Sequence, residues 1–436
     1  MIIRKNNRAR LGCVAAACAL PAVVAAQGVP ERELIWSLEG GAEHTDNVGR
    51  SAVDEESETV GIAALSFQLN TDRPRLDANV GAHLEYRDYL DDAFDSEVVG
   101  GVDGLVSYAF IPERFIWVAT DNFGQIANER AQVDTPENRQ NVNYFSTGPD
   151  IIFPLGGRTL LQLGGRISDA YYENTEEDNQ SLTGSLALIR QLSDLTSLSL
   201  NGSTSETEYD EDQLFGDYRL DQAFVRLAAT GVRTTFSADA GYTAVDLDGE
   251  SSDGLLARVE ASRLVGSRSR IGLSAGTEFA TAGEAFRRDQ GITGIETGAD
   301  DATTASDPYQ LDYAYLTWNT DWERSAFTAG LNARSEAHEV QTDADRDAYG
   351  ATVGVSRQLS RRLDAHLSAG YTEEEFVNAD FNFDEWTVGV GLTWLLGDRV
   401  SFNVRFDHME GSSDDGTRDF EENRAYIGIA YSRRGP

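Results

Sequence analysis

The chain has 436 residues, of which 73 are Asp or Glu and 36 are Lys or Arg, so its formal net charge at pH 7 is −37. Such acidity argues against nucleic acid or anionic lipid as the main partner, because both carry phosphate charge. After residue 26 no apolar run approaches the roughly 18 residues that a membrane-spanning helix needs. If the protein crosses a membrane, it therefore crosses as strands.

The amino-terminal segment has the three zones of a secretory signal peptide. Its basic residues are Arg4, Lys5, Arg8 and Arg10, and an apolar run from Leu11 to Ala26 follows them. We therefore expect residues 1–26 to be removed and residues 27–436 to form a single barrel domain. Cys13 and Cys18 both lie in the signal, so the mature chain would hold no disulfide. The alternatives are a retained helix, for which the run is short, and lipidation of Cys18, for which Ala15 is the wrong residue.

The rest of the sequence alternates apolar and polar residues over long segments. From Leu76 to Tyr86 every second residue is apolar, and the same period of two returns from Val98 to Phe110 and from Trp386 to Trp394. These segments are about twice as long as a globular strand of roughly 5–6 residues, and they match the ~9–11 residues of a tilted membrane strand. They predict strands with one lipid-facing and one wet face.

The connections between these segments alternate between two kinds. Short connections contain Pro, Gly or Asp and usually Arg, which predicts tight hairpin turns. They are 71–74, 111–114, 154–158, 193–196, 231–233, 266–268, 321–324, 360–362 and 397–399. Long connections are strongly acidic, and they include 46–58, 91–97, 173–179, 210–217, 246–253 and 414–422. This asymmetry is typical of an outer-membrane barrel.

We therefore predict an all-β, transmembrane up-and-down antiparallel barrel of about 20 strands (18–20), with short periplasmic turns and long acidic extracellular loops. Phe115 to Ala127 and Tyr218 to Thr230 change phase midway, which predicts bulges there. A soluble β-sandwich is the alternative, but its strands would be shorter and its loops would not segregate by length.

Aromatic residues are expected in two girdles at the membrane interfaces. Beside short turns stand Phe110, Phe115, Phe153, Phe327 and Trp394. Near long loops stand Tyr86, Tyr172, Tyr209, Tyr242, Phe279, Tyr309, Tyr371 and Trp386. Arginines recur beside the short turns, where a guanidinium can reach lipid phosphate while its stem stays apolar.

The polar set of residues would line a wet lumen. Its charged members include Asp77, Glu85, Asp103, Arg166, Asp239, Glu260, Glu278, Arg334, Asp364, Arg405 and Asp407. Acids outnumber arginines, so an open channel should prefer cations or neutral solutes over anions. The alternative is that these charges only pair and hydrate one another.

One segment, Ala282 to Pro308, is long enough to fold inward and narrow the pore. Its charged candidates are Arg287, Arg288, Asp289, Asp300 and Asp301. The segment could equally be a mobile external loop. Only Gln27 to Glu33 separates the expected cleavage point from the first strand, so we expect no amino-terminal plug.

Catalytic and metal-binding patterns are weak. Gly272 to Gly276 matches a nucleophile elbow around Ser274, but that elbow needs a strand-to-helix turn, and Ser274 falls within a predicted strand. The five histidines are scattered over different hairpins. Asp343, Asp345 and Asp347 have the spacing that opens a calcium loop but lack its Gly and Glu. We therefore predict no enzyme activity, no catalytic residues, no cofactor and no metal site.

The first predicted strand closes with Glu43-His44-Thr45-Asp46-Asn47-Val48. With this segment the chain resembles the putative β-barrel porin 2 family, outer-membrane proteins associated with exopolysaccharide and exosortase systems. The resemblance extends along the mature length and implies a pore-like role in polysaccharide export, with no catalytic residues. The chain departs from outer-membrane barrels in general at its end, where Tyr431 is followed by Ser432 to Pro436 instead of closing on an aromatic residue.

We expect a bacterial outer-membrane pore, either a passive channel for small hydrophilic solutes or an exporter of a neutral polysaccharide. The alternative is a structural or adhesive surface barrel whose acidic loops bind cations or partners. An outer-membrane hydrolase is a third hypothesis. Expected partners are outer-membrane lipid and lipopolysaccharide, the barrel-assembly machinery and, through the resemblance, polysaccharide export components, but not nucleic acid.

Overall fold

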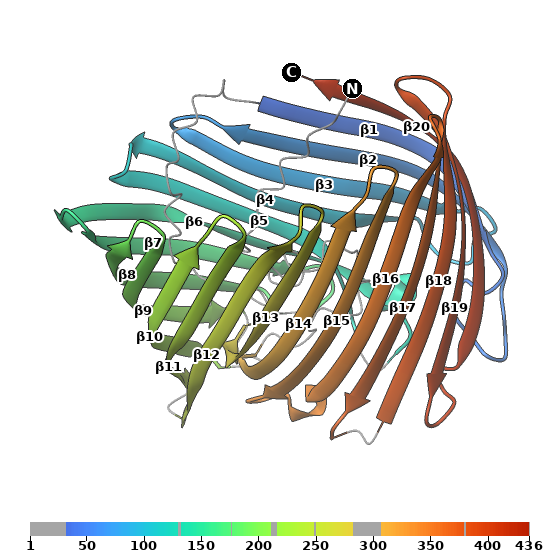
Figure 1. Cartoon of the computed structure of the whole chain (residues 1–436). Coiled ribbons are helices and arrows are strands. Elements are labelled where there is room, and N and C mark those ends of the chain that lie inside the picture. The colour runs from blue at the N-terminus through green and yellow to red at the C-terminus, as the bar shows by residue number, and fades with distance from the viewer. Residues whose placement is uncertain are drawn as a thin grey trace.

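The computed structural model describes residues 32–129, 132–175, 177–210, 216–247, 250–281, 307–378 and 381–435. The expected signal peptide lies outside these residues. Twenty strands make up most of the described chain (Figure 1). They are β1 (Arg32–Thr45), β2 (Glu58–Asp72), β3 (Leu76–Tyr89), β4 (Glu97–Ile111), β5 (Phe115–Ala127), β6 (Arg139–Gly156), β7 (Thr159–Tyr172), β8 (Asn179–Ser193), β9 (Thr196–Tyr209), β10 (Tyr218–Thr230), β11 (Thr234–Leu247), β12 (Glu250–Val265), β13 (Ser269–Ala280), β14 (Tyr309–Asp321), β15 (Ser325–His338), β16 (Arg346–Ser360), β17 (Leu363–Phe376), β18 (Phe381–Leu395), β19 (Val400–Ser413) and β20 (Phe420–Gly435).

In the part of the chain that the structure describes, two connections each contain a single-turn 3-10 helix, η1 (Pro136–Asn138) and η3 (Thr342–Ala344). Within the described ranges, no helix has the length and apolar character needed to span a bilayer.

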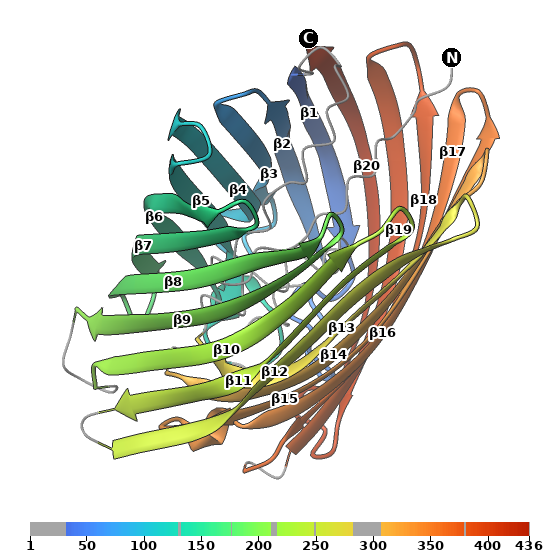
Figure 2. The ribbon, with the colours of Figure 1, turned by 60° about the vertical axis from the view of Figure 1, so that its left-hand side comes forward.

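The strands form one closed wall (Figure 2). Each strand pairs antiparallel with the next along the chain, and β1 pairs antiparallel with β20, from Leu34 opposite Gly435 to Thr45 opposite Arg424. Because of this closure, each of the described strands has a neighbour on both sides, and none forms the open edge of a sheet. The predicted all-β antiparallel barrel of 20 strands is therefore confirmed.

The two rims of the barrel differ in their connections. Every connection on the rim that holds both ends of the described chain is a short turn (Figure 1). The opposite rim carries most of the longer connections, including 46–57, 128–138 and 414–419. The long acidic loop predicted over residues 246–253 is wrong, because β11 continues to Leu247 and β12 already begins at Glu250. Polar residues at this position continue the pairing of β11 with β12 instead of forming a loop.

The predicted alternation is confirmed in β18. Its even-numbered side chains point outward, with Trp386, Val390 and Trp394 each about half exposed, at 52%, 49% and 54%. The odd-numbered residues between them are less accessible and face the interior. Such a row of exposed apolar side chains is the surface that hydrocarbon would cover.

The phase changes predicted to be bulges have a different cause. The pairing of β10 is continuous with both neighbours, and that of β5 with β6 is continuous too. In β10, Val225 and Leu227 point outward near the short-turn rim, whereas Leu220 on the opposite face is buried near the loop rim. The outward residues there are Arg219 and Asp221, both exposed. The wall thus changes from apolar-out to polar-out along one regular strand, as expected where it leaves the hydrocarbon.

Register irregularities do occur, but beside short turns. They lie between Ala109 and Ile111, between Pro154 and Gly156, between Gln191 and Ser193, and between Gln358 and Ser360. Each sits within a few residues of a hairpin turn, where an extra residue lets the ladder enter the turn. The bulges are therefore at strand ends and not in the strand centres where the sequence placed them.

The aromatic girdles are confirmed in part. Tyr86, Tyr242 and Trp386 point outward near the loop rim and are about half exposed. However, Tyr172, Phe279 and Tyr309 are buried in apolar clusters on the inner side, so their assignment to the outer girdle is wrong. Their strands have left the apolar belt at that height, and apolar side chains turn inward there to pack with one another.

Candidate functional site

The inner face of the wall carries chains of ion pairs that the strand register produces directly. In β10 to β12, Arg226 pairs opposite Asp239, and Asp239 pairs opposite Arg258. Directly opposed residues share a face of the sheet, so the three side chains meet. Arg226 Nε donates to Asp239 Oδ1 at 2.6 Å, and Arg258 Nε donates to Asp239 Oδ2 at 2.9 Å. Arg258 Nη1 continues the chain to Glu278 Oε2 of β13 at 3.0 Å.

A second chain of charges crosses β15 to β17. Arg346 Nε donates to Glu336 Oε2 at 3.0 Å, and its Nη1 donates to Glu374. Arg334 pairs with Glu336 at 3.1 Å. Arg346, Glu336 and Glu374 are 0%, 2% and 5% exposed. Charges this deeply buried need one another, because burying a single unpaired ion costs several kcal/mol.

A third group joins β19 to β1, the two strands that flank β20. Arg405 of β19 pairs with Asp407 at 2.7 Å and with Glu43 of β1 at 3.3 Å. The predicted lumen residues Asp239, Glu278, Arg334, Arg405 and Asp407 thus all face the interior in ion pairs. The described inner wall is therefore charged, and much of its charge is paired.

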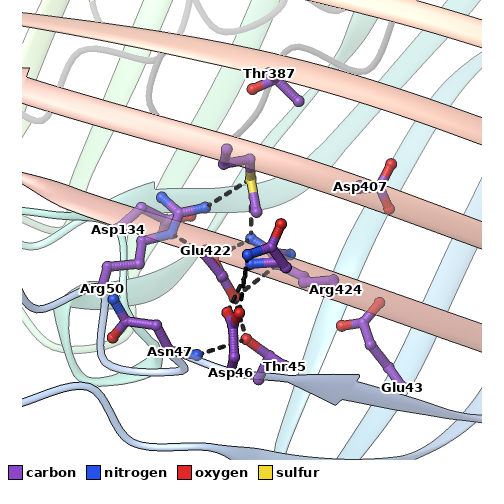
Figure 3. A network of polar contacts seen from close by, with 12 residues as sticks. Glu43, Thr45, Asp46, Asn47, Arg50, Asp134, Thr387, Asp407, Glu422 and Arg424 are labelled. Atoms are coloured by element: carbon purple, nitrogen blue, oxygen red, sulfur yellow. Dashed lines mark hydrogen bonds and ion pairs between the residues drawn. The ribbon is translucent and has the colours of Figure 1, made fainter.

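Arg50 is the centre of a cluster of polar contacts near the loop rim (Figure 3). It lies in the connection between β1 and β2, has a backbone φ of 47° and is 8% exposed. Its guanidinium lies 3.2 Å from Glu422 of β20, 3.7 Å from Glu385 of β18 and 3.9 Å from Asp134 of the β5–β6 connection. We call Arg50 and these three carboxylates the Arg50 node.

Contacts of neutral groups complete the Arg50 node. Arg50 Nη2 lies 3.6 Å from the Met409 sulfur, and its guanidinium carbon lies 5.0 Å from the centre of the Phe420 ring. A planar guanidinium suits this position because it can present several N–H groups to carboxylates while its face lies on an aromatic ring.

The chain before Arg50 is folded back onto β20 by its own polar side chains. Asn47 Nδ2 donates to Ser51 O at 2.8 Å and to Glu421 O at 3.0 Å, and Ser51 N donates to Asn47 Oδ1 at 3.0 Å. Asn423 N and Nδ2 donate to the Asp46 carboxylate at 2.7 and 2.8 Å. The Thr-Asp-Asn segment therefore builds the turn that presents Arg50, a role that the sequence did not predict.

The β5–β6 connection reaches this cluster from the other side. Arg139 Nη2 donates to both oxygens of Asp134 at 2.9 Å, and Arg139 also pairs with Glu97 at 3.2 Å. Burial would raise the pKa of Asp134, but the charges of Arg139 and then Arg50 outweigh it and lower the pKa. Asp134 is therefore ionised at neutral pH and can hold both arginines.

A second contact links the β5–β6 connection to the β19–β20 connection. Arg418 Nη2 donates to Gln132 O at 2.7 Å, and its guanidinium carbon lies 4.2 Å from the centre of the Phe383 ring. Because β1 to β4 separate the β5–β6 connection from the β19–β20 connection, these contacts span several strands along the rim. The described loops thus narrow the loop end of the barrel over this side.

The constriction that the sequence placed in Ala282 to Pro308 stays a prediction. Arg287, Arg288, Asp289, Asp300 and Asp301 lie outside the described residues. Of that segment, Asp307 is described and buried, and its Oδ1 lies 2.9 Å from His338 Nδ1. Its Oδ2 accepts hydrogen bonds from Val340 N and Gln341 N at 2.8 and 3.2 Å.

The weak catalytic and metal patterns do not assemble into sites. Ser274 lies within β13, opposite Glu260 and Tyr315, and not at a strand-to-helix turn. Asp345 accepts from His338 N at 2.7 Å, whereas Asp347 belongs to the ladder of β16 opposite Glu375. Among the described residues, no group of three or more His, Cys, Asp and Glu side chains is arranged to hold a metal ion.

Taken together, a closed antiparallel wall, an apolar outer belt and a charged inner face define a β-barrel of the bacterial outer membrane. Over residues 314–433 the chain is similar to the family described as putative beta-barrel porin 2, whose sequence model matches β15 to β19 and most of β14 and β20. The expected resemblance is confirmed over that range. The Thr-Asp-Asn segment that suggested it lies outside the matched residues.

The solved structures that match this chain include the following three. The siderophore receptor PirA from Pseudomonas aeruginosa has a TM-score of 0.45 at 9% identity, with 93% of this chain and 81% of that chain covered. The FrpB iron transporter from Neisseria meningitidis has a TM-score of 0.42 at 9% identity, covering 91% and 81%. OccK2 from Pseudomonas aeruginosa has a TM-score of 0.37 at 11% identity, covering 92% and 98%. A search of curated proteins found no match.

Proposed function

We propose that the protein is a passive channel for small hydrophilic solutes across the outer membrane, with a narrowed extracellular mouth at the Arg50 node. The observation that carries this proposal is the charge of the inner face. Ion-paired side chains run along this face from β10 to β13 and from β15 to β17. A wall of this kind is stable only beside water or beside matching charge. Barrels of 16–18 strands enclose an aqueous channel, and a twenty-stranded barrel is wider still.

The charge of the mouth supports a preference for cations or neutral solutes. The Arg50 node and its neighbours bring together Asp134, Glu97, Glu385 and Glu422 with Arg50, Arg139 and Arg424. In this cluster four carboxylates stand beside three guanidiniums, and the net negative charge disfavours anions. Export of a neutral polysaccharide is compatible with the same mouth and rests on the family resemblance.

A structural or adhesive barrel is the second candidate. It is favoured by the burial of the loop contacts, because Asn47, Arg50 and Arg418 are 0%, 8% and 6% exposed although they lie at the mouth. If these contacts close the whole opening, the barrel would present surface loops without conducting.

Single-channel recording in planar bilayers separates the two candidates. The channel proposal predicts stepwise conductance with weak cation selectivity from the full-length mature protein. A bilayer that stays electrically silent although the protein has inserted, as shown by protection of its strands from protease, would reject the channel and leave the structural barrel.

A further inference from the structure

A hollow on the short-turn rim is lined by three arginines. It has a volume of about 680 Å³, and the residues that define it here are Arg268, Trp322, Arg324 and Arg357. We call it the basic hollow. Arg268 lies in the β12–β13 turn, Trp322 and Arg324 lie in the β14–β15 turn, and Arg357 lies near the end of β16. Three separate elements thus bring guanidinium groups to one place in a protein whose net charge is −37.

Backbone hydrogen bonds fix the frame of the basic hollow. Asp321 N donates to Arg268 O at 2.9 Å, and Gln358 N donates to Arg324 O at 2.7 Å. The one carboxylate in the lining belongs to Glu323, which is 87% exposed and lies 3.8 Å from Arg268. An exposed pair at this distance contributes little, so the hollow keeps its positive character.

The basic hollow opens on the lipid-facing side of the wall. Arg357 shares its face of β16 with Val355 and Val353, which point outward and are 38% and 39% exposed. Arg357 is paired opposite Ser325, and Val355 opposite Phe327. The hollow therefore lies where the apolar belt meets the interface, the height at which tryptophan and arginine contact head groups.

A second, apolar depression follows on the same outer face of β14 to β18. It has a volume of about 460 Å³, and we call it the outer groove. Large side chains border it, and small ones form its floor. The bordering residues include Trp318, Leu331, Tyr371 and Trp386, and the small ones include Ala329, Ala351 and Ala369. The register explains this shape, because Ala351 is opposite both Leu331 and Tyr371, and Ala369 is opposite Val353.

The spacing of the two depressions suits one molecule. From Arg357 to Val353, at the edge of the outer groove, the chain advances four residues, about 14 Å in a strand. One leaflet of the hydrocarbon core is about half of 30 Å thick. A phosphate in the basic hollow would therefore place its acyl chain against the outer groove.

We propose that the basic hollow and the outer groove together bind one anionic glycerophospholipid of the periplasmic leaflet, the leaflet that the short-turn rim faces in barrels of this architecture. Guanidinium groups bind phosphate oxygens through paired, charge-assisted hydrogen bonds. The large acidic excess of the chain repels anionic lipid in general, so binding should be confined to this local positive site.

Native mass spectrometry of the detergent-purified, delipidated barrel tests the proposal. With dipalmitoyl phosphatidylglycerol we expect one tightly bound lipid, and much weaker binding of dipalmitoyl phosphatidylcholine. The variant Arg268→Gln, Arg324→Gln, Arg357→Gln should lose phosphatidylglycerol affinity by about tenfold or more, as expected for losing charge-assisted contacts. Arg357→Gln alone should show a smaller loss and guards against misfolding of the triple variant.

A matched control removes the same charge elsewhere on the rim. Arg114→Gln, Arg158→Gln, Arg233→Gln changes three exposed turn arginines outside the basic hollow and should leave the affinity unchanged. Equal losses in both triple variants, or no loss in the first, would overturn the proposal.

The outer groove is tested by filling it. Ala351→Trp should weaken binding of dipalmitoyl phosphatidylglycerol but not of the dihexanoyl lipid, whose chains are too short to reach the groove. If inorganic phosphate alone binds as tightly as the long-chain lipid, the acyl chain contributes nothing and the lipid assignment is wrong.

Discussion

Arginine side chains organise the polar interior of this barrel, because one guanidinium can bind several carboxylates from different strands. Arg258 joins Asp239 to Glu278, and Arg346 joins Glu336 to Glu374. Removing one member of such a buried chain would leave its partners as unpaired ions in the wall. The inner face is thus constrained residue by residue, whereas outward apolar residues need only be apolar.

Glu177, a described residue, has a charge that responds to pH near neutrality. It lies in the connection between β7 and β8, and burial, followed by the charge of Asp307, raises its pKa to about 7. The packed state therefore keeps a proton that an unpacked Glu177, with a pKa of 4.5, has lost. The stabilisation is fully present below pH 4.5 and declines as the pH rises towards 7.

We therefore predict that this connection loosens as the pH rises from 5 to 8, by up to about 3 kcal/mol. Hydrogen exchange of residues 173–178 should become faster over this range than intrinsic chemistry explains. Glu177→Gln should remove the additional pH dependence, and Asp194→Asn, in an exposed turn on the other rim, should leave it intact. An unchanged pH profile in Glu177→Gln would show that another group titrates.

At the scale of elements, the loops near the mouth depend on contacts between segments far apart in sequence. Arg50 and Glu422 are 372 residues apart and still lie 3.2 Å from each other. Arg50 could not be identified from the sequence, because it stands in an acidic connection with no periodicity around it. The Thr-Asp-Asn segment beside Arg50 suggested a family resemblance, but it did not indicate that this segment holds Arg50 in place.

We predict that Arg50→Ala releases the connections 46–57 and 128–138 from each other. Loss of a buried ion pair costs about 3 kcal/mol or more, so single-channel conductance should rise and closures should become more frequent. Arg50→Lys should be intermediate, because a lysine reaches fewer carboxylates.

The matched control is Arg219→Ala, which removes an arginine that is 54% exposed on the outer face and paired with Asp221. Its conductance should equal that of the unchanged protein. If Arg50→Ala also conducts like the unchanged protein, the Arg50 node does not limit the mouth.

Sequence periodicity is sufficient to assign the lipid-facing side of some strands but not of others. The stripe from Trp386 to Trp394 could be assigned to the lipid face because β18 keeps one phase throughout. In β10 the period is also two, but the apolar residues change sides along the strand. Periodicity predicts that a segment is a strand, but it does not predict whether lipid, water or protein lies against each face. Tyr309 and Phe279 were therefore assigned to the outer aromatic girdle, although both are buried.

At the scale of the whole molecule, strand number and closure could be predicted because hairpin turns can be counted. An even count of strands returns the chain to its starting rim, and the pairing of β1 with β20 completes the wall. How far the loops enclose the mouth could not be predicted, since contacts such as Arg418 with Gln132 depend on the closed shape itself.

The central claim is that one face of each strand meets lipid and the other meets water. Site-directed spin labelling along β18 in liposomes tests it most directly, using single cysteines in a Cys13→Ala, Cys18→Ala background. Labels at Val388, Val390 and Leu392 should collide mainly with oxygen. Labels at Thr387, Gly391 and Thr393 should collide mainly with a water-soluble nickel complex. Equal accessibility of both sets to either reagent would contradict the account.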